Sequence, residues 1–218
     1  MDCKFLFLGF LCCIALQFAS ANDVLTSPIV TNWGVWGAFQ HCPAGTKVIG
    51  FQLKTEPWDA WDVVIDDSCL NGIKFYCGHP SSSGPGAPVD VITSSEGNWG
   101  KWGQIFWCDG RGFARGFMLR SVEATTANVD ESATNNIRIL CSEGTQFIEG
   151  DGERWGEWTS PRICQETQYI CGLQTQVEPP QGISTDDTAL NNIRVECCDM
   201  TKEELVSYGI VNSTNKLA

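Results

Sequence analysis

The sequence is poor in positive charge and in histidine. Lysine and arginine number 14 against 26 acidic residues, and the resulting net charge of −12 would repel phosphate backbones and anionic membrane surfaces. We therefore expect no nucleic-acid partner and no binding to an anionic membrane surface. We also expect no membrane insertion, because no stretch after the N-terminal apolar run is apolar enough to span a membrane. His41 and His79 stand in no zinc-binding spacing and no Cys-x-x-Cys pair occurs, so we expect no metal ion or other cofactor.

Familiar catalytic motifs are also missing. The chain has no Gly-x-Ser-x-Gly turn, no phosphate-binding glycine loop and no His-Glu-x-x-His pair. A nucleophilic Cys69–His79 pair is conceivable, but a lone thiol beside its own repeat's core favours an inert residue. Nothing in these motifs points to a particular enzyme class.

The N-terminus has the pattern of a secretory signal peptide. Lys4 is followed by an apolar run over 5–18 and then by Ala19-Ser20-Ala21. The run is shorter than the roughly 20 residues that cross a bilayer, which argues against a membrane anchor. We expect residues 1–21 to be the signal peptide and the protein to be secreted and extracellular.

The remainder of the chain contains one unit written three times. A Trp-Gly-x-Trp block begins at Trp33, Trp99 and Trp155, and a cysteine follows nine residues after each of these tryptophans. A second block, Asp-[Asp/Glu]-[Ser/Thr]-x-x-Asn-[Gly/Asn]-Ile-[Lys/Arg]-x-x-Cys, ends at Cys77, Cys141 and Cys197. The repeats cover about 28–79, 89–143 and 145–198 of one domain spanning 22–200.

The repeats predict an all-β fold. Alternating apolar residues and Gly, Asn and Asp turn signals favour about four short antiparallel strands in each copy. One such sheet alone would expose its apolar face, whereas three sheets around a common axis bury their faces together. We expect the Trp-Gly-x-Trp tryptophans to line that core. Residues 201–218 are expected to form a flexible tail, in which Thr201 and Glu204 have capping-box spacing before a short turn over 202–207.

Secretion makes disulfides the expected state of the nine cysteines that follow the signal peptide. Equivalent cysteines begin and end each copy, and a rotationally consistent map joins the end of one copy to the start of the next. The predicted pairs are Cys77–Cys108, Cys141–Cys164, Cys42–Cys197 and Cys171–Cys198. This map leaves Cys69 as a buried thiol outside the disulfides.

Together, the two blocks resemble the vitelline membrane outer layer protein family. The resemblance covers about residues 25–200 and is most evident over 170–191. It implies a β-prism of three Greek-key antiparallel sheets with pseudo-threefold symmetry, in a secreted structural component of the outer layer of an egg envelope. A transferase-like activity on N-acetylglucosamine oligosaccharides is associated with that family, without catalytic residues to transfer to this sequence. Cys69, the insert from Pro80 to Pro88 and the tail after Met200 depart from the family pattern.

Paired acids are the first candidates for chemistry, and each pair precedes the repeated asparagine. The pairs are Asp66/Asp67, Asp130/Glu131 and Asp186/Asp187. A glycosidase needs two carboxyl groups about 5–10 Å apart, but the same acids could accept backbone N–H bonds in a turn. Their presence in all three copies favours the turn, because a catalytic group is needed only once.

The first copy alone contains Trp58, Asp59, Trp61 and Asp62, where indole faces lie beside carboxylates. Such a pattern suits a sugar ring, whose C–H face stacks on indole while its hydroxyls take polar partners. These four residues are our candidate carbohydrate-binding site, although the two tryptophans could instead cap the core. Asn212-Ser213-Thr214 is a candidate N-glycosylation site.

These patterns favour a secreted structural component of an extracellular coat or egg-envelope-like matrix that contacts N-acetylglucosamine-containing glycans. Coat or matrix proteins and glycans are its expected partners. The alternatives are a glycosyl-transferring enzyme acting on chitooligosaccharides and a carbohydrate-binding lectin.

Overall fold

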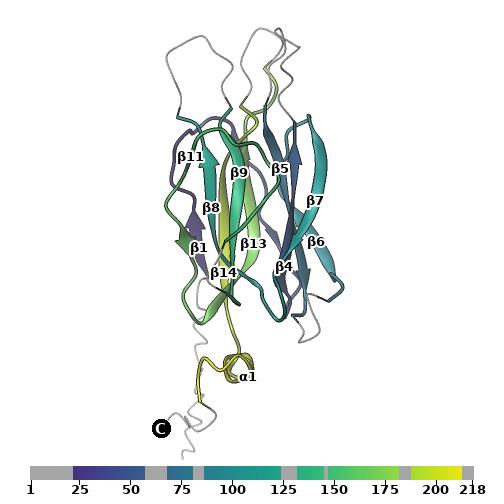
Figure 1. The fold of residues 1–218 in the computed structure, drawn as a ribbon, viewed down its shortest axis with the longest axis vertical. Helices are drawn as coiled ribbons and strands as arrows, with labels where there is room; N and C mark the ends of the chain where they lie inside the picture. Colours follow the sequence, from purple (N-terminus) through teal and green to yellow (C-terminus); the bar gives the residue numbers. More distant parts are fainter. Residues whose placement is uncertain are drawn as a thin grey trace, which may run out of the picture.

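The computed structural model describes residues 22–56, 68–80, 86–123, 132–144, 147–181 and 188–212. Over these residues the regular secondary structure is β-strand except for one short helix, α1 (Lys202–Ser207), which lies below one end of the elongated body (Figure 1). The predicted signal peptide, 1–21, lies outside the described residues. None of the described helices has the length and hydropathy that a bilayer-spanning segment requires.

Three antiparallel sheets form the body. The first has the order β6 (Asp90–Thr93), β5 (Leu70–Gly78), β4 (Lys47–Thr55), β7 (Lys101–Trp107). The second has the order β10 (Phe147–Glu149), β9 (Thr134–Cys141), β8 (Ala114–Ser121), β11 (Glu157–Trp158), and β12 (Arg162–Ile163) also pairs with β8. The third has the order β1 (Asp23–Thr26), β14 (Leu190–Asp199), β13 (Gln168–Val177), β2 (Val35–Trp36), and β3 (Gln40–His41) also pairs with β13.

The two long strands of each sheet come from one repeat, and the strand with the Trp-Gly-x-Trp block that pairs with one of them comes from another repeat. In the first sheet β4, β5 and β6 follow one another, whereas β7, which contains Trp102, returns to pair with β4. The second sheet repeats this Greek-key order with β11, and β2 closes the ring on the third sheet. The Trp-Gly-x-Trp block therefore completes the sheet of the preceding repeat, which confirms the predicted fold class.

Inward-facing side chains of the three sheets make one core. Alternate residues of the long strands face it, and those named next are at most 1% exposed. They are Phe51, Leu53, Ile73 and Phe75 in the first sheet, Phe117, Leu119, Ile137 and Ile139 in the second, and Ile170, Leu173, Ile193 and Val195 in the third. Burying such a side chain stabilises the fold by about 1.5–3 kcal/mol.

The prediction that tryptophans line this core is wrong. Trp33, Trp99 and Trp155 are 39%, 53% and 52% exposed, and the second tryptophan of each block is only half-buried. The physical reason is strand exchange, by which the Trp-Gly-x-Trp strand of one repeat joins the sheet of another. Such a strand lies at the junction of two sheets rather than between their inner faces. Phenylalanine and aliphatic side chains fill the axis instead.

Eight of the nine described cysteines form four disulfides. They are Cys42–Cys77, Cys108–Cys141, Cys164–Cys197 and Cys171–Cys198. The last pair confirms the prediction, and Cys69 is buried outside the four bonds as expected. The predicted pairs Cys77–Cys108, Cys141–Cys164 and Cys42–Cys197 are wrong.

Strand exchange also explains this error. The N–H of Cys42 donates to the Cys171 carbonyl at 2.8 Å, so the first cysteine of repeat one lies against the third sheet. Its partner Cys77 belongs to β5 of the first sheet. Cys108 and Cys164 lie against the preceding sheet in the same way. A cystine within one repeat therefore already joins two neighbouring sheets, and the three bonds together close the ring.

The segment expected to be a flexible tail contains α1. The Thr201 side chain accepts from the Glu204 N–H and the Glu204 carboxylate accepts from the Thr201 N–H, so the predicted capping box is present. Tyr208, just after the helix, packs edge-to-face on Phe113 with 5.1 Å between ring centroids. Residues 201–212 thus fold back on the end of the prism.

Candidate functional site

Three exposed tryptophans share one end of the prism. Trp33, Trp99 and Trp155 each precede an outer strand that pairs with the last residues of β13, β4 or β8. Because those three strands all end at the same side of the body, the three indoles lie around the same end. We call Trp33, Trp99 and Trp155 the tryptophan ring.

Buried asparagines fix the backbone of two members of this ring. The N–H of Trp99 donates to Oδ1 of Asn71 at 3.3 Å, and the N–H of Trp33 donates to Oδ1 of Asn191 at 3.1 Å. Both asparagines are at most 2% exposed, and each donates through Nδ2 to a buried Ser or Thr hydroxyl at 2.8 Å. The repeated asparagine of the second block therefore positions a tryptophan of the first block.

The glycine after each of these tryptophans permits close approach to the neighbouring sheet. Gly34, Gly100 and Gly156 have φ between +78° and +82°, a region that L side chains rarely adopt. A Cβ at each would lie 2.2–2.5 Å from main-chain atoms of the adjoining strand's end. Only glycine therefore allows the chain that follows each exposed tryptophan to lie directly against that strand.

Carboxylates lie at the same end. Glu56 accepts from the Ser68 hydroxyl at 2.7 Å, and Glu178 accepts from the Thr188 hydroxyl at 2.6 Å. The crevice between Trp99 and Glu178 has a volume of only about 10 Å³, which is roughly the space of one water molecule. This end therefore offers exposed aromatic faces for surface contact.

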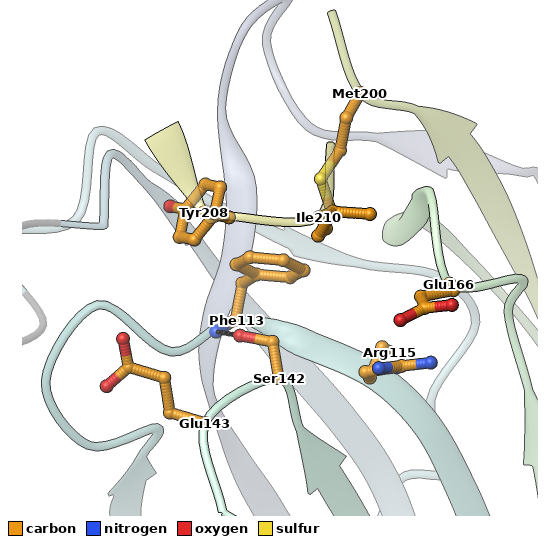
Figure 2. Close-up of a pocket in the computed structure, with 8 residues that line it drawn as sticks. All are labelled: Phe113, Arg115, Ser142, Glu143, Glu166, Met200, Tyr208 and Ile210. Carbon is orange, nitrogen blue, oxygen red and sulfur yellow. Dashed lines mark hydrogen bonds between the residues drawn. The ribbon is translucent and has the colours of Figure 1, made fainter. Parts of the chain in front are cut away.

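The opposite end has a cavity of about 220 Å³ between the second sheet and the tail (Figure 2). We call it the tail pocket. Phe113 and Tyr208 contribute perpendicular rings, and Met200 and Ile210 contribute apolar atoms. Burial raises the pKa of the Tyr208 hydroxyl.

Charged groups border the tail pocket. Arg115 projects towards the side where Glu166 lies, and Glu143 stands across the pocket from them (Figure 2). Nε of Arg115 is buried and has no hydrogen-bond partner among the described residues. Glu143 accepts from the N–H of Arg111 at 3.3 Å.

A buried lysine holds the tail against the prism. Lys47 is 1% exposed, and its Nζ lies 2.5 Å from Oε1 of Glu204 and 3.5 Å from the ring centroid of Tyr169. Burial lowers the pKa of Lys47 although the Glu204 carboxylate opposes that shift. Burial alone would raise the pKa of Glu204, but hydrogen bonds from Lys47 and Thr201 lower it.

The family follows from the sequence match. Residues 23–200 match the family described as "Vitelline membrane outer layer protein I (VOMI)". The chain belongs to the vitelline membrane outer layer protein I family. It is 40% identical over 185 residues to the vitelline membrane outer layer protein 1 homolog of Mus musculus, covering 84% of this chain and 85% of that one. It is 39% identical over 169 residues to the Homo sapiens homolog, covering 76% and 78%.

Solved structures show where else the family's fold occurs. A prostate-specific WGA16 glycoprotein lectin matches with a TM-score of 0.51 at 10% identity, over 81% of this chain and 99% of that one. Calystegia sepium agglutinin matches with a TM-score of 0.52 at 11% identity, over 82% and 97%. At such identities the likeness concerns the β-prism fold alone. The vitelline membrane outer layer match ends at residue 200, so Tyr208 and Ile210 of the tail pocket lie beyond it.

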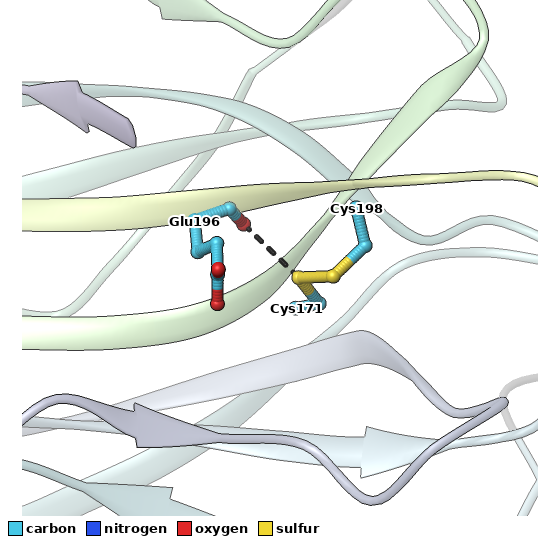
Figure 3. A group of neighbouring side chains, drawn as sticks. All are labelled: Cys171, Glu196 and Cys198. Carbon is cyan, nitrogen blue, oxygen red and sulfur yellow. Dashed lines mark hydrogen bonds between the residues drawn. A yellow bond between two sulfur atoms is a disulfide. The ribbon is translucent and has the colours of Figure 1, made fainter. Parts of the chain in front are cut away.

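Cys171, Glu196 and Cys198 lie close together, but they do not make a metal site (Figure 3). The two sulfurs form a disulfide and offer no thiolate. The Glu196 carboxylate is bound by Nε2 of His41 at 2.7 Å and by Nδ2 of Asn22 at 2.9 Å. This group ties β1, β3, β13 and β14 together.

Several predicted site residues fall outside the described part of the chain. Trp58, Asp59, Trp61 and Asp62 lie within 57–67, and the paired acids lie within 57–67, 124–131 and 182–187. Their proposed roles stay predictions. Asn212 is exposed, whereas Ser213 and Thr214 of its sequon are outside the described residues.

The conceivable Cys69–His79 pair is excluded. The two residues flank opposite ends of β5 (Leu70–Gly78), and at about 3.3 Å per residue such a strand separates them by roughly 30 Å. The sequence reasoning also missed both sites described above. The thrice-repeated exposed indole could have been found from the glycine beside it, whereas nothing in the tail sequence indicated a pocket.

Proposed function

We propose that this vitelline membrane outer layer protein is a secreted structural component of an extracellular coat or egg-envelope-like matrix, and that it contacts N-acetylglucosamine-containing glycans through the tryptophan ring. The observation that supports this best is the exposure of three equivalent indoles at one end of a rigid prism. Tryptophan side chains contribute strongly to interface energies, and exposed apolar side chains gathered on one surface mark interaction sites.

The chemistry of this end suits carbohydrate. An indole face attracts the C–H face of a sugar ring, and nearby polar groups take the hydroxyls. The shallow surface between Trp99 and Glu178 fits a chain that lies across it. Three equivalent contacts on one end strengthen binding to a polymer far beyond a single contact, provided that the polymer reaches more than one of them.

The disulfides support an extracellular structural role. Three of the four join neighbouring sheets around the ring, so the prism cannot open at any corner without reduction of a bond. Disulfides of this kind persist in oxidising extracellular environments. A protein that must keep its shape in a coat benefits from that covalent closure.

Retention on an N-acetylglucosamine polymer tests the proposal. We expect the wild-type protein to bind chitin beads saturably, Trp99→Ala to weaken binding about ten-fold, and the triple variant of Trp33, Trp99 and Trp155 to lose it. Trp99→Phe keeps an aromatic face and should retain most of the affinity, and Val89→Ala, at a site 56% exposed elsewhere on the surface, serves as the control. Equal retention of wild type and triple variant would contradict the proposal. Release of shortened or lengthened chitooligosaccharides would instead support the enzyme alternative.

A further inference from the structure

The tail pocket has the features of a ligand-binding site. Neither the sequence match to the family nor the threefold repeat explains why a pocket forms there. One wall, with Phe113, belongs to the prism, and the opposite wall, with Tyr208 and Ile210, belongs to the segment beyond the family match. Two perpendicular aromatic rings 5.1 Å apart bound a volume of about 220 Å³. This volume is below the roughly 300–1,000 Å³ of pockets that hold drug-sized ligands, so it suits a molecule of about one sugar ring.

The wall made by the tail is fixed before any ligand arrives. The Arg111 guanidinium lies 4.6 Å from the Tyr208 ring centroid, and its Nη1 donates to the Ser207 carbonyl at 3.2 Å. Glu204, also in α1, binds the buried Lys47. A site whose walls are already in place loses less entropy when it binds.

The polar groups of the tail pocket define the ligand's chemistry. Arg115 is partly exposed and lines the pocket, so its guanidinium can donate to a ligand oxygen. Glu143 and Glu166 are exposed acceptors that suit hydroxyl donors. Two carboxylates against one guanidinium, on a chain of net charge −12, disfavour phosphate, sulfate and acidic sugars.

We propose that the tail pocket binds one ring of a neutral saccharide, which stacks on the partly exposed ring of Tyr208 and accepts a hydrogen bond from the Arg115 guanidinium. The proposal rests on the glycan-contacting function proposed above and adds to it a second site at the other end of the prism. A protein with a saccharide site at each end could link two glycan chains.

Titration of the secreted full-length protein with neutral methyl glycosides, measured by isothermal titration calorimetry, tests this site. We expect saturable binding of at least one neutral glycoside, weakened about ten-fold or more by Arg115→Met and by Tyr208→Ala. Tyr208→Phe keeps the ring and should stay within about two-fold of wild type. Glu203→Gln, on the exposed side of α1, is the matched control within the tail.

The outcomes separate this site from the tryptophan ring. Trp99→Ala should leave methyl glycoside binding unchanged. Tyr208→Ala should weaken methyl glycoside binding, while the protein is still retained on chitin through the tryptophan ring. The inference is overturned if no neutral glycoside saturates, if glucuronate or inorganic phosphate binds instead, or if Arg115→Met and Tyr208→Ala both keep wild-type affinity. If chitin retention still depends on the tryptophan ring in those cases, the proposed function stands without the tail pocket.

Discussion

The guanidinium carbon of Arg138 lies 4.0 Å from the ring centroid of Trp158, which belongs to the block of the next repeat. Lys74 lies 3.9 Å from the Trp102 centroid and Arg194 lies 3.9 Å from the Trp36 centroid, so the contact recurs in every sheet. The basic residue of the second block thus clamps the outer strand that contains the second tryptophan. This contact explains why the two sequence blocks recur together.

Removing one of these clamps should loosen one outer strand. We expect Arg138→Met to lower the free energy of unfolding by about 1 kcal/mol, because it loses a partly exposed cation–π contact and the ion pair with Glu149. Urea denaturation followed by circular dichroism measures this loss. Lys101→Met, at an exposed position of β7, is the control, and equal midpoints for the two variants would contradict the clamp.

The cystine Cys108–Cys141 should stabilise the ring by linking the first and second sheets. It closes a segment with a sequence separation of 33 residues, for which chain-entropy arguments give about 3–4 kcal/mol. We expect the double variant Cys108→Ser/Cys141→Ser to unfold at a correspondingly lower urea concentration. Non-reducing peptide mapping of the wild type provides the independent check, and a Cys77–Cys108 peptide would contradict the structure.

Two glycines with similar backbone angles allow the cost of backbone strain to be measured apart from the cost of a steric clash. Gly100 has φ +80° with Thr55 main-chain atoms 2.5 Å from an added Cβ, whereas Gly45 has φ +78° with nothing within 4 Å. We expect Gly45→Ala to cost about 1–2 kcal/mol and Gly100→Ala to cost at least about 2 kcal/mol more. Thermal or urea unfolding compares them. Similar losses would show that the outer strand does not need close approach at this point.

Tail docking should weaken in acid through Glu204. Its pKa is lowered from the ordinary value of 4.5 in the folded protein, so its stabilising effect is present above pH 4.5 and is lost as the pH falls through the lowered value. Hydrogen exchange of the α1 amides across that range measures docking. Glu204→Gln should exchange faster at neutral pH and lose most of the acid dependence, whereas an unchanged acid dependence in this variant would exclude Glu204 as its source.

Lys47 also makes the stability of the folded protein rise with pH, but in the alkaline range. Burial lowers its pKa below the ordinary 10.5, so the unfolded chain binds more protons than the folded one between the two values. The contribution of this one group to stability therefore rises with pH across that window. Lys47→Met should remove this dependence while leaving the aliphatic part of the side chain packed on Tyr169.

Repetition made the β-prism predictable, because three equivalent units with strand patterning require a shared core. The same reasoning could not say which sheet each unit's first block joins. Cys42 and Trp36 both belong to the block of repeat one, yet both lie against β13 of repeat three. The errors over the tryptophan core and over three disulfides share this cause.

The tail shows the opposite limit. Its capping box was evident from Thr201 and Glu204 and is present, since capping depends only on local spacing. Its docking depends on Lys47, which is distant in sequence and whose burial no local pattern indicates. Long-range partners of this kind decide where the tail pocket forms.

The most direct test of the account is to follow the indole N–H resonances of the nine tryptophans during titration with a soluble chitooligosaccharide. Single Trp→Phe variants assign each signal. We predict saturable shifts for Trp33, Trp99 and Trp155 and unchanged signals for the clamped Trp36, Trp102 and Trp158. Shifts confined to the clamped residues, or the absence of any shift at saturating sugar, would contradict glycan contact through the tryptophan ring.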